Sequence, residues 1–224
     1  MTTKIVALLP MRHESERVPG KNYRYLGTKP LYRHILDTLL DCPLIEEVAI
    51  DTDSPVIAED ISRELPHVRL IERPAHLRAS DVPMNEVLLH DISFTQADFY
   101  LQTHSTNPFL RTGTIERAIS ALLESCPQHD SLFSVTALQT RLWDEQGRPM
   151  NHDPAVLLRT QDLPPVYEEN SNLYLFSAET LQTRRNRIGE RPLLFEIERT
   201  EAWDIDDELD FQIAEVLWAK MGAA

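Results

Sequence analysis

The 224-residue sequence has few cysteines and no long apolar run. Its two cysteines, Cys42 and Cys126, are far apart and match no metal-ligand spacing, so we expect free thiols in a reducing cytoplasm. No stretch approaches the roughly 18 apolar residues of a membrane span. The apolar start of the chain is interrupted too early, by Pro10 and Arg12, to be a signal peptide. These absences predict a cytoplasmic protein with no membrane contact.

Basic residues are scarce relative to acidic ones. The 22 Lys and Arg residues against 36 Asp and Glu residues give a formal net charge of −14. Nucleic acids are bound by clustered Lys and Arg, so this balance argues against a nucleic-acid partner. A small anionic ligand is still compatible, because a few cations in one loop outweigh the net charge locally. The length and the ordinary composition predict one domain over residues 1–224.

Short apolar runs alternate with amphipathic segments over the first 136 residues. Strands are predicted at 4–9, 47–51, 68–71, 98–102 and 131–136, and helices at 30–40, 54–64, 84–94 and 112–125. Repeated β-α units of this kind predict a mainly parallel sheet with helices on both faces. Ligands bind beyond the carboxyl ends of such strands, so the loops at 10–22, 52–54 and 103–111 are the first candidates for a site.

The remaining sequence is less regular. Residues 139–165 contain four prolines and one glycine, which favour loops, turns or a hairpin. Strands are predicted at 173–176 and 193–197, and helices at 178–183 and 207–221. The basic run RRNR at 184–187 is compatible with an acceptor carboxylate or a partner subunit, but a solvated turn is the expectation.

The loop after the first predicted strand gathers cations. The segment LPMRHESERVPGKN brings together Arg12, Arg17 and Lys21, with Gly20 available for a positive φ. Cations and free backbone N–H groups in such a loop suit a polyphosphate. The loop matches neither G-x-x-x-x-G-K-[ST] nor G-x-G-x-x-G, so P-loop and Rossmann motifs are excluded. The alternative is a solvated loop whose cations pair with its own glutamates.

Two aspartates near the end of the chain form a second candidate site. If the segment WDID is extended, Asp204 and Asp206 point to the same side. Two carboxylates without a basic neighbour suit a divalent cation such as Mg²⁺, although the segment's acids also suit the start of the last helix. A bound triphosphate needs such an ion to neutralise the reacting phosphoryl group, and in-line attack on the α-phosphorus would expel pyrophosphate.

Six segments in order carry a family resemblance. Residues 5–30, IVALLPMRHESERVPGKNYRYLGTKP, resemble the opening motif of the acylneuraminate cytidylyltransferase family, the CMP-sialic acid synthetase-like enzymes. The other segments similar to family motifs are VAIDTDSPVIA (48–58), RPAHL (73–77), 101–111, NSNLY (170–174) and 203–210. The resemblance implies an α/β, three-layer Rossmann-like nucleotidyltransferase fold with a mainly parallel sheet. It also implies a small acceptor-binding and dimerisation part at about 139–200.

The resemblance further implies transfer of CMP from CTP to a sugar acid, either a nonulosonic or another 2-keto-3-deoxy acid. Pyrophosphate is released, Mg²⁺ is the cofactor, and the enzyme is usually a homodimer. The residues carried over are Arg12 and Lys21 for the triphosphate, Asn22 and Arg73 for cytidine, Asp204 and Asp206 for the metal, Asn170 and Tyr174 for the acceptor, and Gln102 between nucleotide and acceptor.

The sequence also departs from the family pattern. The stretch 13–17 adds glutamates to the phosphate loop, and the segment after Gln102 is three residues longer, which makes His104 a rival for the position of Gln102. Ser171 replaces the glycine that follows Asn170 in the family. These departures leave two alternatives open. One is a cytidylyltransferase for a phosphonate or other small acid, and the other is a non-catalytic nucleotide-binding homologue.

Overall fold

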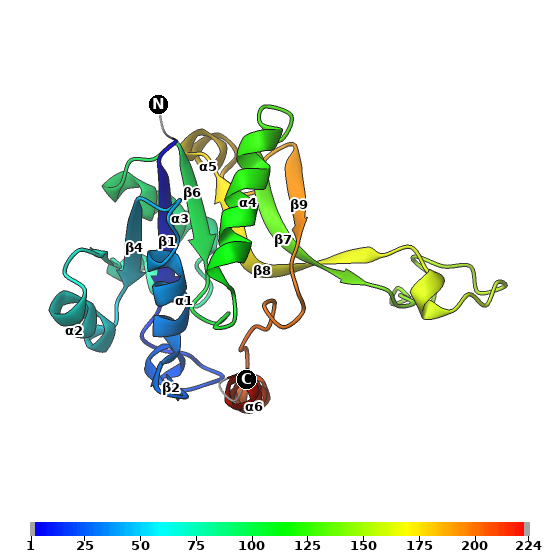
Figure 1. Ribbon diagram of the computed structural model, residues 1–224, viewed down its shortest axis with the longest axis horizontal. Helices are drawn as coiled ribbons and strands as arrows, with labels where there is room; N and C mark the ends of the chain where they lie inside the picture. The colour runs from blue at the N-terminus through cyan, green and yellow to red at the C-terminus, as the bar shows by residue number, and fades with distance from the viewer. Residues whose placement is uncertain (1–2, 222–224) are drawn as a thin grey trace.

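A seven-stranded sheet forms the centre of the computed structural model, which describes residues 3–221 (Figure 1). The strands are β1 (Ile5–Met11), β4 (Glu47–Thr52), β5 (Arg69–Glu72), β6 (Phe99–Thr103), β7 (Ser131–Leu138), β8 (Val166–Phe176) and β9 (Pro192–Glu196). Their order is β5-β4-β1-β6-β8-β7-β9. Within this sheet only β8 runs antiparallel to its neighbours. The predicted mainly parallel sheet is therefore confirmed.

Helices cover both faces of the sheet. Helices α1 (Leu31–Leu40), α2 (Pro55–Glu64) and α4 (Thr112–Ser125) pack on one face, and α3 (Met84–Asp91) and α5 (Ala178–Arg184) pack on the other. All seven residues of β1 are buried. Its odd-numbered residues belong to the first core, and Val6 and Leu8 belong to the second. A strand buried on both faces needs a continuous apolar run, which is why the sequence predicted it. The three-layer α/β fold class is confirmed.

The helix starts follow local capping rules. Ser54 precedes α2, and its hydroxyl accepts a hydrogen bond from the backbone N–H of Ile57 at 3.4 Å, with Pro55 at the first helical position. Ser177 caps α5 in the same way through the N–H of Thr180 at 3.1 Å. These contacts satisfy backbone donors that a helix leaves free at its first turn. Short 3₁₀ turns lie at Lys21–Tyr23, Ala75–Leu77, Ile92–Phe94 and Thr160–Asp162.

An arm leaves the body of the molecule. Strands β7 and β8 pair as a hairpin that extends beyond the sheet, and residues 139–165 lie at its far end (Figure 1). The sequence predicted β8 only from residue 173, because its first half, VYEENSN, has few apolar residues. The rest of the predicted 139–200 part contributes β8, α5 and β9 to the sheet and its covering layer.

A small third core joins the segment after β1 to the C-terminal part of the described chain. A hairpin of β2 (Tyr25–Leu26) and β3 (Lys29–Pro30), which the sequence did not predict, lies beside the last helix α6 (Glu208–Met221). Buried Leu26 and Phe211 belong to this core together with Ile205, which precedes α6. None of the helices in residues 3–221 has the length and apolar character that a membrane crossing requires.

The strand order brings the candidate loops to one edge. From β1 the chain proceeds to β4 and β5 on one side and then returns to β6 on the other side of β1. The carboxyl ends of β1 and β6 therefore flank a topological switch point, where open α/β sheets bind ligands. The loops at 12–22 and 104–111 start at these two strand ends.

Gly27 offers a test of how α6 docks. It lies in the β2–β3 turn at φ 63°, and an added Cβ would stand 1.8 Å from Nε1 of Trp218 on α6. We expect Gly27→Ala to lower the free energy of unfolding by about 2 kcal/mol or more, through backbone strain and displacement of the indole. Urea denaturation measures this effect. Gly147→Ala is the matched control, since Gly147 also has a positive φ but no atom within 4 Å of the added Cβ. Equal losses in both variants would contradict the docking argument.

Candidate functional site

Lys21 connects the first loop to the acidic segment near the end of the chain. Its side chain is almost fully buried, and Nζ donates a hydrogen bond of 2.6 Å to the backbone carbonyl of Ile205. Burial lowers the pKa of Lys21, while the nearby carboxylates of Asp204 and Asp206 act in the opposite direction. The preceding Gly20 has φ 66°, the positive value that the sequence analysis anticipated. The predicted phosphate cation and the predicted metal carboxylates are thus neighbours.

The amide of Asn22 ties two loops together. Its Nδ2 donates to the carbonyl of Arg12 at 2.7 Å, and its Oδ1 accepts from the hydroxyl of Ser105 at 2.7 Å. Arg12 follows β1 and Ser105 follows β6, so Asn22 fixes the two sides of the switch point. The family resemblance implied a cytidine contact for Asn22. The structure adds a positioning role for Asn22. The participation of Ser105 was not predicted from the sequence.

A cleft of about 290 Å³ opens at this edge of the sheet. Five predicted residues line it together: Arg12, Lys21, Asn22, Arg73 and His104. Arg17 and the loop's two glutamates line it as well, so the cleft contains both cations and acids. The structure therefore brings together the residues predicted for triphosphate and cytidine.

Asp204 and Asp206 lie beside this cleft, in a segment without regular secondary structure. The N–H of Ile205 between them donates to the carbonyl of Thr106 at 3.0 Å, which fixes the segment to the loop after β6. Burial raises the pKa of Asp204, and repulsion by Asp206 adds to the shift. Oδ1 of Asp204 is buried without a hydrogen-bond partner among residues 3–221. Asp206 accepts a 2.7 Å hydrogen bond from Arg17, which links the loop after β1 to the acidic segment.

The neighbouring acids serve the start of α6, as predicted. The N–H of Asp210 donates to Oδ1 of Asp207 at 3.0 Å. Oδ2 of Asp210 in turn accepts from the N–H groups of Asp206 and Asp207 at 3.0 Å each. Glu208 forms an ion pair with Arg24 at 2.7 Å. Negative side chains at a helix N-terminus satisfy free N–H groups and complement the helix dipole.

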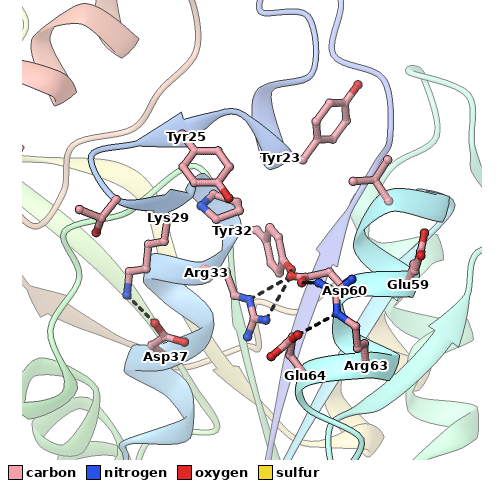
Figure 2. A pocket seen from close by; sticks show the side chains of 13 residues that line it. Tyr23, Tyr25, Lys29, Tyr32, Arg33, Asp37, Glu59, Asp60, Arg63 and Glu64 are labelled. Carbon is pink, nitrogen blue, oxygen red and sulfur yellow. Dashed lines mark hydrogen bonds and ion pairs between the residues drawn. The ribbon is translucent and has the colours of Figure 1, made fainter.

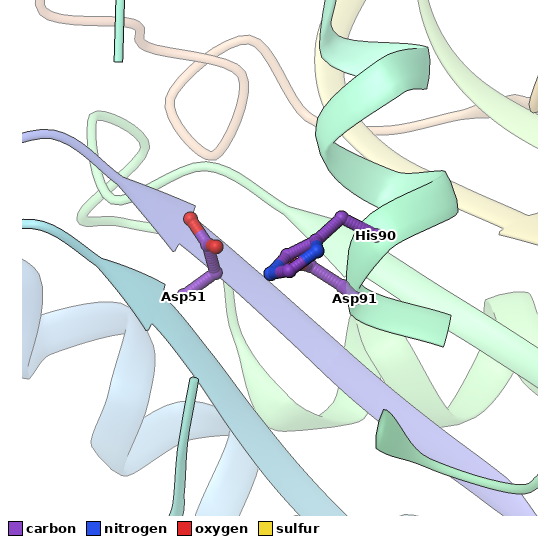
Figure 3. Close-up of side chains that lie close together, drawn as sticks. All are labelled: Asp51, His90 and Asp91. Carbon is purple, nitrogen blue, oxygen red and sulfur yellow. The ribbon is translucent and has the colours of Figure 1, made fainter. Parts of the chain in front are cut away.

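Arg73 belongs to a buried charge cluster that the sequence analysis did not predict. Its guanidinium pairs with the carboxylate of Asp51 at the end of β4, and both side chains are almost fully buried. Asp91 and His90 of α3 face Asp51 (Figure 3), and the three offer potential ligand atoms within 4.8 Å of one another. Burial, followed by the charge of Asp51, raises the pKa of Asp91 to about 9. One proton therefore stays on Asp91, and the charge of Asp51 is balanced by Arg73.

Gln102 and Tyr174 meet a third residue, Arg187. Gln102 on β6 is fully buried, and its Oε1 accepts from Nη1 of Arg187. The guanidinium lies 3.5 Å from the centroid of the Tyr174 ring. The expectation of a solvated turn at 184–187 is wrong for Arg187, because its side chain turns inward. His104 lies two residues beyond Gln102, and burial lowers the pKa of His104 to about 3. His104 lines the cleft, whereas the fully buried Gln102 is not among its lining residues and contacts Arg187.

Asn170 lines a second groove, of about 660 Å³, together with Asp204 and Asp206. Its Oδ1 accepts from Ser134 at 2.6 Å, and its Nδ2 donates to Thr136 at 3.0 Å. Ser171, which replaces the family's glycine, has φ 55°. The backbone at this position thus adopts the conformation that glycine takes most readily. The predicted acceptor residue and the predicted metal carboxylates face the same groove.

Another cavity, of about 570 Å³, lies between the start of α1 and α2 (Figure 2). Its three cations are each paired with a carboxylate. Arg33 and Arg63 pair with Asp60, and Lys29 pairs with Asp37. This cavity contains none of the predicted site residues. Its internal charge pairing leaves the edge of the sheet as the better candidate for an anionic ligand.

Comparison with known proteins agrees with this geometry. The family model described as "Cytidylyltransferase" matches residues 6–220. This chain belongs to the cytidylyltransferase family. A cytidylyltransferase of this family is a nucleotidyltransferase, and the predicted enzyme class is confirmed.

The relatives and the fold agree with the family. The chain is 28% identical to the CMP-N,N'-diacetyllegionaminic acid synthase of Legionella pneumophila, with 96% of each chain covered. It is 24% identical to the N-acylneuraminate cytidylyltransferase of Escherichia coli, over 96% of this chain but 52% of that protein. The structure of CMP:2-keto-3-deoxy-manno-octonic acid synthetase complexed with CTP superposes with a TM-score of 0.72 at 16% identity, covering 98% of this chain and 100% of the other. The predicted family is confirmed.

The buried cluster around Arg73 yields a pH prediction. An unfolded Asp has a pKa of about 3.9, so between pH 5 and 8 the folded protein binds one proton more at Asp91, whose pKa is about 9, than the unfolded chain does. Stability from this proton therefore falls as pH rises through this window. We expect Asp91→Asn to remove that loss, so the unfolding free energy of the wild type falls relative to the variant from pH 5 to 8. Urea denaturation across this range measures it, and parallel curves would contradict the assignment.

Asp51→Asn is the companion variant. It leaves Arg73 buried without its carboxylate, which costs about 3–5 kcal/mol for a broken buried ion pair. If Asp51→Asn lowers the free energy of unfolding at pH 7 by less than Asp91→Asn does, the proton resides on Asp51 instead.

Proposed function

We propose that this cytidylyltransferase transfers CMP from CTP to the hydroxyl group of a sugar acid, with release of pyrophosphate and with Mg²⁺ as cofactor. The observation that carries the proposal is the cleft at the carboxyl edge of the sheet that Arg12 and Lys21 line, because Lys21 there lies near Asp204 and Asp206 of the adjoining groove. Relatives named for legionaminic acid and acylneuraminate support a nonulosonic or related 2-keto-3-deoxy acid as the acceptor class.

The nucleotide would lie in the cleft after β1. Arg12 and Lys21 would balance the triphosphate charge, and Arg73 at the same cleft is the candidate for the base. Arg17 now pairs with Asp206, and a triphosphate would compete for its guanidinium. In-line attack forms a bond between the acceptor oxygen and the α-phosphorus, while the bond to the bridging oxygen of the β-phosphate breaks. The residues then act by positioning and charge stabilisation, with no covalent intermediate on a side chain.

The two aspartates fit a divalent cation. Oδ1 of Asp204 is buried without a partner among residues 3–221, and the repulsion between Asp204 and Asp206 favours a bound positive charge. When bound, the ion would neutralise charge on the reacting phosphoryl group. Oxygen ligands from only two carboxylates leave places for water and phosphate oxygens, as Mg²⁺ prefers.

The acceptor would lie on the other side of the strand ends. Asn170 faces the groove that contains the carboxylates, and Gln102 and Tyr174 lie behind His104. The neutral imidazole of His104 has a buried Nε2 without a partner among the described residues, so it can hydrogen-bond the acceptor. Both candidates for the place between nucleotide and acceptor would thus take part: His104 at the cleft, and Gln102 through its contact with Arg187.

We also propose that the arm forms a homodimer interface. Its far end exposes several large apolar side chains: Trp143, Met150, Val156, Leu157 and Leu158. Leu157 is 89% exposed. Exposed apolar side chains gathered on one protrusion favour a protein contact.

The metal proposal predicts a loss of turnover in Asp204→Asn. Pyrophosphate release from CTP in the presence of Mg²⁺ and a 2-keto-3-deoxy sugar acid should fall about 100-fold or more, because stabilising charge on the phosphoryl group is lost. Asp207→Asn is the matched control, since asparagine also caps a helix and Asp207 lies outside both clefts. Full activity in Asp204→Asn would overturn the metal assignment. Wild-type protein that binds CTP in calorimetry but releases no pyrophosphate with any acceptor would favour a non-catalytic homologue.

The dimer proposal predicts that Leu157→Glu shifts the protein to a monomer. The wild type should elute in size-exclusion chromatography with light scattering at twice the mass of one chain. Val56→Glu places the same change at an exposed position on α2 and should stay dimeric. A monomeric wild type, or equal dissociation in both variants, would contradict the proposed interface.

A further inference from the structure

Arg187 differs from its basic neighbours in the direction of its side chain. Arg184 pairs with Glu190, and Arg185 pairs with Glu86, both on the surface. Arg187 instead reaches from the loop after α5 toward the interior and meets Gln102 on β6. Its own backbone N–H donates to Asn85 at 3.2 Å, which fixes the loop against the start of α3.

The guanidinium of Arg187 has no carboxylate within 4 Å among residues 3–221, unlike the two arginines before it. Within the described chain it donates one hydrogen bond, to Oε1 of Gln102, and rests on the ring of Tyr174. The Tyr174 hydroxyl donates to Glu169, an acid whose charge acts on the pKa of this guanidinium. Burial lowers the pKa of Arg187. A partly buried cation without a paired carboxylate is costly, so a bound anion would stabilise this arrangement.

The position of Arg187 separates it from the triphosphate cations. His104 lies close enough to both Arg187 and Lys21 for each cation to lower its pKa. Lys21 faces the cleft after β1, whereas Arg187 contacts Gln102 and Tyr174. The neutral ring of His104 is thus near two positive groups. One suits the triphosphate, and the other is left for a second anion.

We infer that Arg187 determines acceptor specificity by binding the carboxylate of the sugar acid, an inference that rests on the proposed function. A guanidinium has five N–H donors in a plane that matches both oxygens of a carboxylate, and only one hydrogen bond is used here. Tyr174 and Gln102 hold the guanidinium in place from two sides. Arg187 therefore distinguishes an acid from a neutral analogue of the same sugar.

The experiment compares an acid with its amide. N-acetylneuraminic acid and 2-keto-3-deoxy-manno-octonic acid are each assayed beside the corresponding carboxamide, with CTP, for the wild type and Arg187→Met. We expect the ratio of kcat/KM for acid over amide to fall about 10- to 100-fold in the variant, the size of a charged hydrogen bond, with the KM for CTP unchanged. Arg185→Met is the matched control and keeps the wild-type ratio, because Arg185 pairs with Glu86 on the surface.

Structural damage gives a different result. If Arg187 only supports Tyr174 and Gln102, acid and amide lose activity equally, and the inference is overturned. Arg187→Lys keeps the charge and loses the planar donor pair, so it should show a smaller fall in the same ratio. If Arg187→Met does not fold, Arg187→Lys decides the question. A kcat/KM ratio of acid over amide that stays at the wild-type value in Arg187→Lys, with equal losses for both substrates, would also overturn the inference.

Calorimetric binding of the two acids, with a non-hydrolysable CTP analogue present, separates this inference from the proposed function. If the wild type binds the acids and Arg187→Met does not, the inference is supported even when no pyrophosphate is released. The missing pyrophosphate release would contradict only the proposed function. A wild type that binds neither acid overturns the role of Arg187.

Discussion

The hydrogen bond from the ammonium of Lys21 to the carbonyl of Ile205 is the contact on which the candidate site depends. It spans 184 residues of sequence and satisfies a buried charge with a backbone dipole. A cation in this position needs an oxygen partner, and that partner lies between the two aspartates proposed to bind metal. One contact therefore places the loop after β1, the acidic segment and the third core at the same edge of the sheet.

Much of the fold could be predicted from the sequence because parallel strands buried on both faces require continuous apolar runs, as in β1 and β6. The first half of β8 escaped prediction because a hairpin in an exposed arm needs no such run. Among the site residues, Asp51 carried a signal that was missed: an acid inside the apolar run VAIDT requires a buried partner. The inward direction of the Arg187 side chain had no signal in the sequence, because RRNR has the same composition whether a side chain faces solvent or the core.

The net charge of −14 describes the surface better than the site. At the edge of the sheet, Lys21 and Arg73 are buried cations and Arg187 is a partly buried one, and each is stabilised differently. A backbone carbonyl partners the first, a carboxylate partners the second, and an aromatic ring with one amide oxygen partners the third. In such surroundings the local arrangement of a few groups outweighs the sum over the chain, because desolvation strengthens every interaction between charges.

The place of α6 in the sequence has a consequence for biosynthesis. All seven strands of the sheet have been synthesised by residue 196, but Asp204, Asp206 and the helix that packs against Leu26 come afterwards. During synthesis the acidic segment is added after every strand of the sheet, and the cleft beside β1 has no neighbouring carboxylates from this segment until the last helix docks. A chain interrupted after β9 would retain every strand of the sheet and lack both the proposed metal site and the helix that completes the third core.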